Sequence, residues 1–101
     1  MNMAGVYSGT LHYLKAVAAV GSAKDGKAVA DKMKQLPAED SIYGKSVVRE
    51  DGRVLHPAYL FEVKKPEESK GPGDLYHLRA TIPMEEAFRP LKDGGCPLVK
   101  G

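Results

Sequence analysis

The sequence predicts an α+β chain, with an N-terminal αα-hairpin followed by an antiparallel β-hairpin and a short C-terminal helix. In the first third of the 101 residues, apolar side chains recur every three or four positions, which is the period of one helix face. From Ser41 onward they alternate with polar side chains, which is the period of a strand. A chain of this length forms at most one small domain with a modest core.

The first helix is expected over residues 6–20. Its apolar side chains fall on one stripe, which consists of Val6, Thr10, Tyr13, Leu14, Val17 and Ala18. Ser8, His12 and Lys15 fall off this stripe, and Gly21 supplies a stop because glycine can adopt the left-handed conformation that ends a helix.

A second helix follows after a short link. Asp25 can cap its N-terminus, Val29, Met33 and Leu36 mark a narrow apolar face, and Pro37 closes the segment. The short link predicts that the two helices form an αα-hairpin.

Extended segments occupy the second half. Residues 46–49 and 53–56 flank the turn dipeptide Asp51-Gly52. Residues 58–64 and 75–82 alternate between apolar and polar side chains, so they are expected to form a long hairpin around a polar loop at 65–74. Pro83 and two acids favour a short helix over residues 84–89, and residues 91–101 are expected to be irregular.

Composition and charge exclude several classes of protein. Fifteen Lys and Arg against thirteen Asp and Glu leave a formal net charge of +2, which is too even a balance for a nucleic-acid binder. No apolar run is long enough to span a membrane. The first residues lack the basic and apolar regions of a signal peptide. We therefore expect either a cytoplasmic protein or a piece of a longer one.

No group of residues has the spacing of a catalytic or metal site. His12, His56 and His77 lack zinc-ligand spacing and are expected to be unrelated surface or boundary residues. Cys96 has no recognisable base beside it and is expected to be an ordinary thiol. The residues thus predict no metal, no cofactor and no enzyme, and a small enzyme using Cys96 and a histidine is the weakest alternative.

Several segments, in order along nearly the whole chain, resemble the C-terminal part of type I periplasmic binding proteins of the leucine and branched-chain amino-acid receptor family. They are AGVYS at residues 4–8, LHYLKAV at 11–17, MKQLP at 33–37, GK at 44–45, REDGR at 49–53, YLFEVKKP at 59–66, ESKGP at 68–72, ATIP at 80–83, EAFRPL at 86–91 and GCPLVK at 95–100. The set is specific as a whole, although no single motif is decisive.

The resemblance implies an α+β fragment of an α/β fold. Such receptors have two α/β lobes joined by three crossover segments, and they hold a solute between the lobes. Residues 1–101 would be the C-terminal part, with 1–41 a helical segment of the first lobe. Residues 42–101 would hold the last crossover, the β-hairpin and the tail of the second lobe. About two thirds of a full receptor, with most solute-contacting loops, has no counterpart here.

The function that the resemblance implies is binding. The chain would be a fragment of a periplasmic receptor for ABC-type uptake of branched-chain or related amino acids or small organic acids, not competent to bind solute alone. The partners of the full-length parent would be that solute and an inner-membrane permease. Tyr7 is the one candidate ligand-binding residue, on the approach to the first helix, and its alternative role is packing beside that helix.

A stand-alone small dimeric interaction protein is the alternative function. A two-stranded hairpin is marginally stable by itself, and its edges recruit further strands. The apolar stripe of the first helix also needs a cover. A dimer that joins two hairpins into a larger sheet and buries both stripes would meet these needs, with residues 37–45 as a hinge for exchange. We therefore expect a homo-oligomer of the isolated chain.

Overall fold

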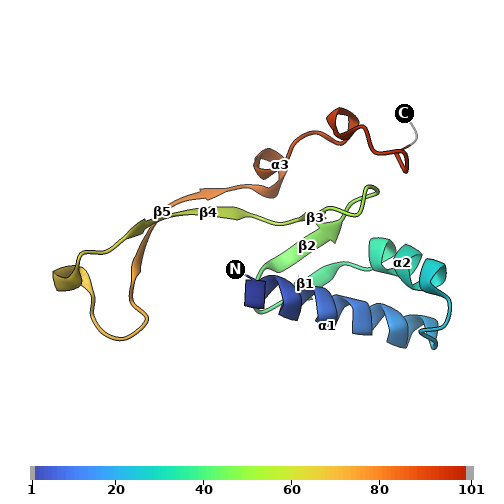
Figure 1. Ribbon diagram of the computed structural model, residues 1–101, viewed down its shortest axis with the longest axis horizontal. Coiled ribbons are helices and arrows are strands. Elements are labelled where there is room, and N and C mark those ends of the chain that lie inside the picture. Colours follow the sequence, from blue (N-terminus) through green and yellow to red (C-terminus); the bar gives the residue numbers. More distant parts are fainter. Residues whose placement is uncertain (1, 100–101) are drawn as a thin grey trace.

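The computed structural model describes residues 2–99 and has an N-terminal body from which a long hairpin projects (Figure 1). The body contains two helices and a three-stranded antiparallel sheet of order β1-β2-β3. These elements are α1 (Asn2–Val20), α2 (Gly26–Gln35), β1 (Ala38–Asp40), β2 (Gly44–Val48) and β3 (Val54–Leu55). Helix α1 lies against α2 and β1, and α2 lies against β2.

The hairpin and the C-terminal segment follow. The hairpin consists of β4 (Ala58–Val63) and β5 (Tyr76–Ile82), with a 3-10 turn at Pro66–Glu68 in its loop. Helix α3 (Met84–Ala87) comes after it, where a short helix over residues 84–89 was expected. A 3-10 turn at Leu91–Gly94 follows, where an irregular tail was expected. The order of two helices, antiparallel strands and a short helix confirms the predicted fold class. None of the helices within residues 2–99 is long and apolar enough to cross a membrane.

Helix α1 begins earlier than predicted. It starts at Asn2, so Gly5 lies inside it. An internal glycine costs a helix only about 1 kcal/mol relative to alanine, which does not prevent it from forming. The helix ends at Val20, and Gly21 follows as the expected stop, with a positive φ of 78° and its N–H donating to the Val17 carbonyl at 2.8 Å.

The buried face of α1 is not the predicted apolar stripe. Ala16 is 0% exposed and His12 is 6% exposed, whereas Val6 and Leu14 on the stripe are 68% and 54% exposed. His12 and Ala16 lie one turn apart, so α2 and β1 approach α1 on a narrow face. The prediction that His12 is a surface or boundary residue was wrong. Periodicity finds the side with most apolar area, and here nothing within residues 2–99 covers that side.

Helix α2 follows its prediction closely. The Asp25 carboxylate accepts the N–H of Ala28 at 3.1 Å, and Val29 is only 2% exposed. The helix ends at Gln35, just before Pro37. A matched pair of Lys27 and Asp31 lies on its exposed side, with 2.7 Å between Nζ and Oδ2.

Replacing the cap residue tests this account of α2. We expect Asp25→Ala to lower the free energy of unfolding by about 1 kcal/mol, because an orphan N–H at the first turn loses its acceptor. Asp31→Ala in the same helix removes one exposed ion pair and is the control, with a smaller loss. Urea denaturation followed by circular dichroism measures both, and an equal loss would contradict the capping role.

Strand β1 was missed by the sequence analysis. It pairs antiparallel with β2 from Ala38 opposite Ser46 to Asp40 opposite Gly44. Asp40 shapes the turn between them, because its carboxylate accepts the N–H groups of Ile42 and Tyr43 at 2.7 and 2.8 Å. A three-residue strand with two acids has no alternation to detect, so only its pairing reveals it.

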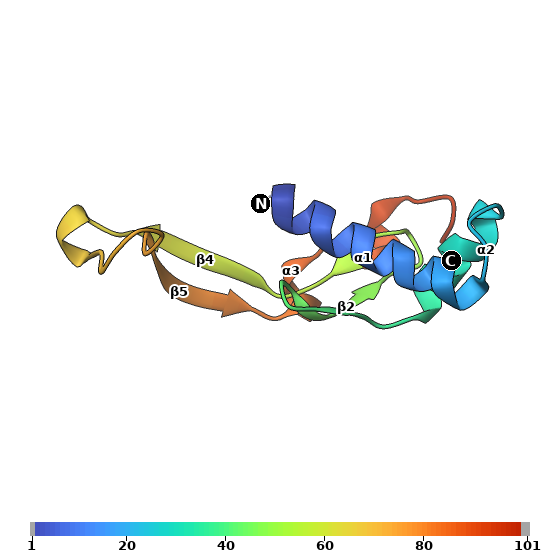
Figure 2. The ribbon, with the colours of Figure 1, turned by 90° about the horizontal axis from the view of Figure 1, so that it is seen from below.

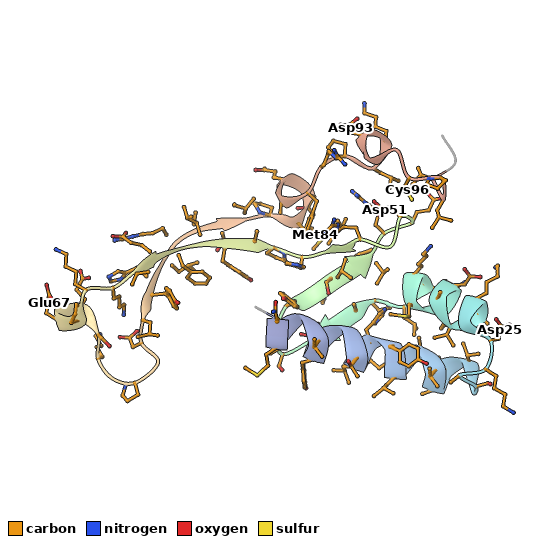
Figure 3. The ribbon with its side chains drawn as sticks, viewed as in Figure 1. Asp25, Asp51, Glu67, Met84, Asp93 and Cys96 are labelled. Atoms are coloured by element: carbon orange, nitrogen blue, oxygen red, sulfur yellow. The ribbon has the colours of Figure 1, made fainter. Side chains whose placement is uncertain are left out.

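The β4–β5 hairpin is paired from Ala58 opposite Ile82 to Val63 opposite Tyr76, with a shift of register between Leu60 and Phe61. No other helix or strand within residues 2–99 covers either face (Figures 2 and 3). Seven large apolar side chains are at least 38% exposed: Tyr59, Leu60, Phe61, Val63, Tyr76, Leu78 and Ile82. Exposure does not alternate along either strand, because within residues 2–99 no core lies against one face of the hairpin.

The core is small for a chain of this length. Among residues 2–99, the buried hydrophobic residues are Ala16, Val29 and Ala38. The radius of gyration is 17.0 Å, against about 13 Å for a compact domain of 100 residues. The stripe of α1 and both faces of the hairpin thus leave large apolar side chains in contact with solvent.

Candidate functional site

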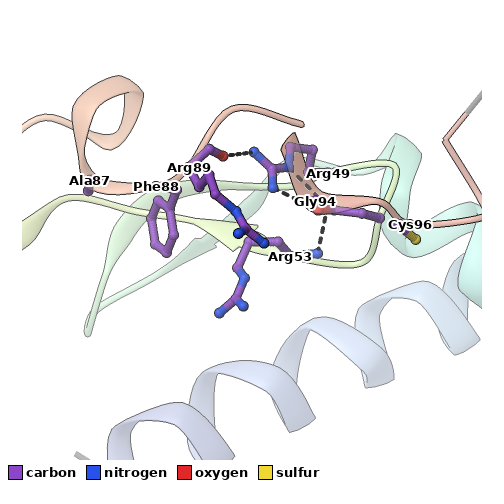
Figure 4. A pocket seen from close by; sticks show the side chains of 8 residues that line it. Arg49, Arg53, Ala87, Phe88, Arg89, Gly94 and Cys96 are labelled. Atoms are coloured by element: carbon purple, nitrogen blue, oxygen red, sulfur yellow. Dashed lines mark hydrogen bonds and ion pairs between the residues drawn. The ribbon is translucent and has the colours of Figure 1, made fainter. Parts of the chain in front are cut away.

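An open pocket of about 350 Å³ lies where the C-terminal segment passes the turn between β2 and β3 (Figure 4). Its polar side chains come from that turn and from the segment after α3. The lining residues are Arg49, Asp51, Arg53, Ala87, Phe88, Arg89, Gly94 and Cys96. The two sides of the pocket come from segments about forty positions apart in the sequence, which the fold brings together.

The turn is fixed by backbone bonds and one ion pair. The Arg49 N–H donates to the Arg53 carbonyl at 2.7 Å, and Gly52 has the positive φ of 85° that the tight turn requires. Arg49 Nε and Nη2 donate to the two carboxylate oxygens of Asp51 at 2.9 and 2.7 Å. This bidentate pair fixes both side chains.

Arg49 also connects the turn to the C-terminal segment. Its Nη1 donates to the Arg89 carbonyl at 2.9 Å. The Arg49 guanidinium holds the pKa of Asp51 at about 2, with the Arg53 N–H contributing through its bond to the carboxylate. Asp51 therefore stays ionised at any pH where the chain would function, and its charge is neutralised by Arg49.

Aromatic rings form the neighbouring wall. The Arg53 guanidinium lies over the Phe88 ring, 5.9 Å from its centroid. His56 lies between Phe88 and Tyr43, with centroid distances of 5.4 and 4.4 Å. A second open hollow of about 430 Å³ shares Asp51, Arg53 and Phe88 with the first. The cation–π contact with the Phe88 ring restrains the Arg53 guanidinium on one side.

The cysteine and the histidines that the sequence analysis considered do not meet in one site. Cys96 lines the first pocket beside Asp51 (Figure 3), and His56 lines only the second. His77 lies on the hairpin, where its Nε2 is 3.6 Å from the Glu68 carboxylate. Within residues 2–99, no group of three or more His, Cys, Asp and Glu side chains could hold a metal ion.

His12 is placed between α1 and α2. Because the Met33 carbonyl accepts from His12 Nε2 at 2.8 Å, that nitrogen carries the proton. It lines a small cavity of about 100 Å³ with Ser8 and Ser46. The Ser8 hydroxyl donates to the Asp40 carboxylate, which lowers the pKa of Asp40 together with the backbone N–H groups of Tyr43 and Ile42. These contacts tie α1 to the β1–β2 turn.

Tyr7 lies inside α1, not on an approach to it, because the helix begins at Asn2. It is 51% exposed and belongs to the outward face. It lines a shallow apolar hollow of about 330 Å³ with Val6, Thr10, Leu11 and Leu14. This hollow is separate from the first pocket, called the arginine pocket below, of which the sequence analysis singled out Cys96 and Asp51 but none of the three arginines. The only signal for that pocket was the Asp-Gly turn with arginines on both sides.

Comparisons with known proteins give a consistent result. A family model described as periplasmic binding protein matches residues 1–72. A crystal structure of a periplasmic binding protein from Burkholderia mallei is similar, with 46% identity and a TM-score of 0.85. It covers 93% of this chain and 24% of its own chain. None of the curated proteins compared with the chain matches it.

A second solved structure has the same relation to the chain. It is that of a branched chain amino acid ABC transporter periplasmic ligand-binding protein from Burkholderia xenovorans LB400, with 41% identity and a TM-score of 0.84, covering 93% of this chain and 25% of its own. The chain thus spans about a quarter of the length of these two proteins. The family resemblance seen in the sequence is confirmed, and the elements match part of that fold. The chain belongs to the periplasmic binding protein family.

Proposed function

We propose that this chain serves as part of a solute-binding receptor for ABC-type uptake and binds no solute by itself. The observation that carries the proposal is the pair of uncovered apolar surfaces on α1 and the β4–β5 hairpin. In a chain that aligns over 93% of its length with a quarter of larger binding proteins, such surfaces are where the other three quarters would pack.

The lobe assignment belongs to this proposal. Residues 1–41 would belong to the first lobe, and residues 42–101 would form the last crossover, the hairpin and the tail of the second. The boundary falls in the turn between β1 and β2, where Asp40 binds both the Ser8 hydroxyl and the following N–H groups. Lobe closure around the solute in the full receptor would be driven by contacts made only in the closed state.

The solute would be a branched-chain or related amino acid or a small organic acid, and the receiving partner would be an inner-membrane permease. The receptor would work in the periplasm, as the names of the similar proteins indicate for those proteins. Binding, not catalysis, is the role assigned to the chain. A solute site needs convergent polar groups from opposing walls, and the isolated chain has no such pair of walls around Tyr7.

A chimera tests this function. Residues 2–99 would replace the matched quarter of the Burkholderia xenovorans protein, and leucine, isoleucine and valine would be titrated by calorimetry. We expect saturable binding by the chimera whenever the parent binds, and none by the isolated chain. Binding of leucine to the isolated chain, or a folded chimera that has lost the parent's binding, would overturn the proposal.

The same chimera tests Tyr7 as a ligand-binding residue. Tyr7→Ala would weaken solute binding while leaving the melting temperature nearly unchanged if the ring contacts solute. Leu14→Ala on the same face of α1 is the control, because it removes packing without removing a polar group. A lower melting temperature for both variants with unchanged affinity would assign Tyr7 to packing.

The second candidate function is that of a stand-alone, dimeric interaction protein. The same exposed apolar surfaces favour it, because a second copy could cover them. The chimera distinguishes the two functions, since an interaction protein that has lost the uptake role need not restore solute binding.

A further inference from the structure

We propose that the arginine pocket between the β2–β3 turn and the C-terminal segment binds a small oxyanion, a carboxylate or a phosphate, through Arg53 and Arg89. This site lies apart from the Tyr7 hollow. The proposal goes beyond solute uptake and does not depend on it.

The pocket carries an excess of positive charge. Three guanidinium groups and a single carboxylate line the pocket. Arg49 and Asp51 neutralise each other through their bidentate pair. Within residues 2–99, the guanidinium groups of Arg53 and Arg89 form neither a hydrogen bond nor an ion pair, and two positive charges are therefore left to one open pocket. An oxyanion would accept from both, and guanidinium groups match the geometry of carboxylate and phosphate.

The Arg53 guanidinium and the backbone of Arg89 are restrained before any anion binds. Phe88 lies beneath the Arg53 guanidinium at 5.9 Å, and Arg49 Nη1 holds the backbone of Arg89 through its carbonyl at 2.9 Å. Less conformational freedom is then lost when an anion binds. At about 350 Å³, the pocket holds a phosphate or a small dicarboxylate with its water. The ion pair with Asp51 thus fixes the Arg49 guanidinium, which in turn holds the Arg89 backbone beside the pocket.

Titration with inorganic phosphate and with succinate tests the site and distinguishes the two anion classes. The chain would be labelled with ¹⁵N, and the Arg53 and Arg89 side-chain N–H signals followed by NMR. We expect saturable shifts of both signals with at least one anion in the millimolar range, weakened by added NaCl. Arg53→Gln and Arg89→Gln should each weaken binding about tenfold, because each removes one charged donor.

Arg79→Gln is the control. Arg79 pairs with Glu62 on the hairpin, outside the pocket, so this variant should bind as the parent chain does. The titrations would be repeated in the Burkholderia xenovorans chimera, which provides a folded context regardless of how stable the isolated chain is. Equal weakening by Arg79→Gln, or the absence of saturable binding of both anions in both contexts, would overturn the proposal. Loss of leucine binding by the chimera with anion binding kept would instead count against the receptor function alone.

Discussion

Replacing Val29 by aspartate is expected to unfold the helical body of the chain. Val29 is 2% exposed on the face of α2 that packs into the body, and it is one of three buried hydrophobic residues in residues 2–99. Burying a carboxylate without a partner, together with the lost apolar area, costs about 3 kcal/mol or more. That is a large part of the total stability of an ordinary domain, about 5–15 kcal/mol.

The control for this substitution is the next residue. Ala30 is exposed on the same helix, so Ala30→Asp should cost only a few tenths of a kcal/mol in helix propensity. Thermal melts followed by far-UV circular dichroism measure both variants. Equal melting temperatures for the two variants would show that α2 does not pack as described.

The isolated chain is expected to self-associate. The stripe of α1 and the faces of the β4–β5 hairpin expose Leu14 at 54% and Leu78 at 55%. In water these surfaces are driven together, at roughly 25 cal/mol per Å² of apolar area buried. We expect a dimer or larger oligomer at micromolar concentration by size exclusion with light scattering.

Leucine-to-glutamine variants distinguish association through these two surfaces from non-specific association. Leu14→Gln and Leu78→Gln should shift the chain toward monomer, because each places a polar group on one of the two surfaces. Leu98→Gln is the control, since Leu98 is 61% exposed in the C-terminal tail, away from both surfaces. A parent chain that is a folded monomer, with a melt independent of concentration, would contradict the expectation.

Most elements could be predicted from the sequence because their signals are local. Asp25, Pro37 and the Asp51-Gly52 turn act within a few residues, and the structure has each where the sequence indicated. The direction in which α1 faces could not be predicted, since it depends on what covers the helix. Periodicity assigned the stripe of Leu14 to the inside, whereas the body packs against Ala16.

The arginine pocket could not be predicted for a related reason. Its central contact joins Arg49 to the carbonyl of Arg89, and residues so far apart along the chain carry no shared pattern. Strand β1 was missed because its three residues gain their structure from β2 alone. The family resemblance rests on segments along nearly the whole chain, and it therefore identified the family, which local sequence patterns did not.

Fragment complementation tests whether this chain can serve as part of a solute-binding receptor. The chain would be mixed with the part of the Burkholderia xenovorans protein outside the matched segment, about three quarters of that protein. The relative's own matched segment would serve as the positive control. We predict a one-to-one complex with far-UV and near-UV circular dichroism of a folded receptor, and saturable leucine binding in the mixture but in neither part alone. If the relative's own segment restores leucine binding and this chain neither forms the complex nor restores binding, the chain does not serve as part of such a receptor.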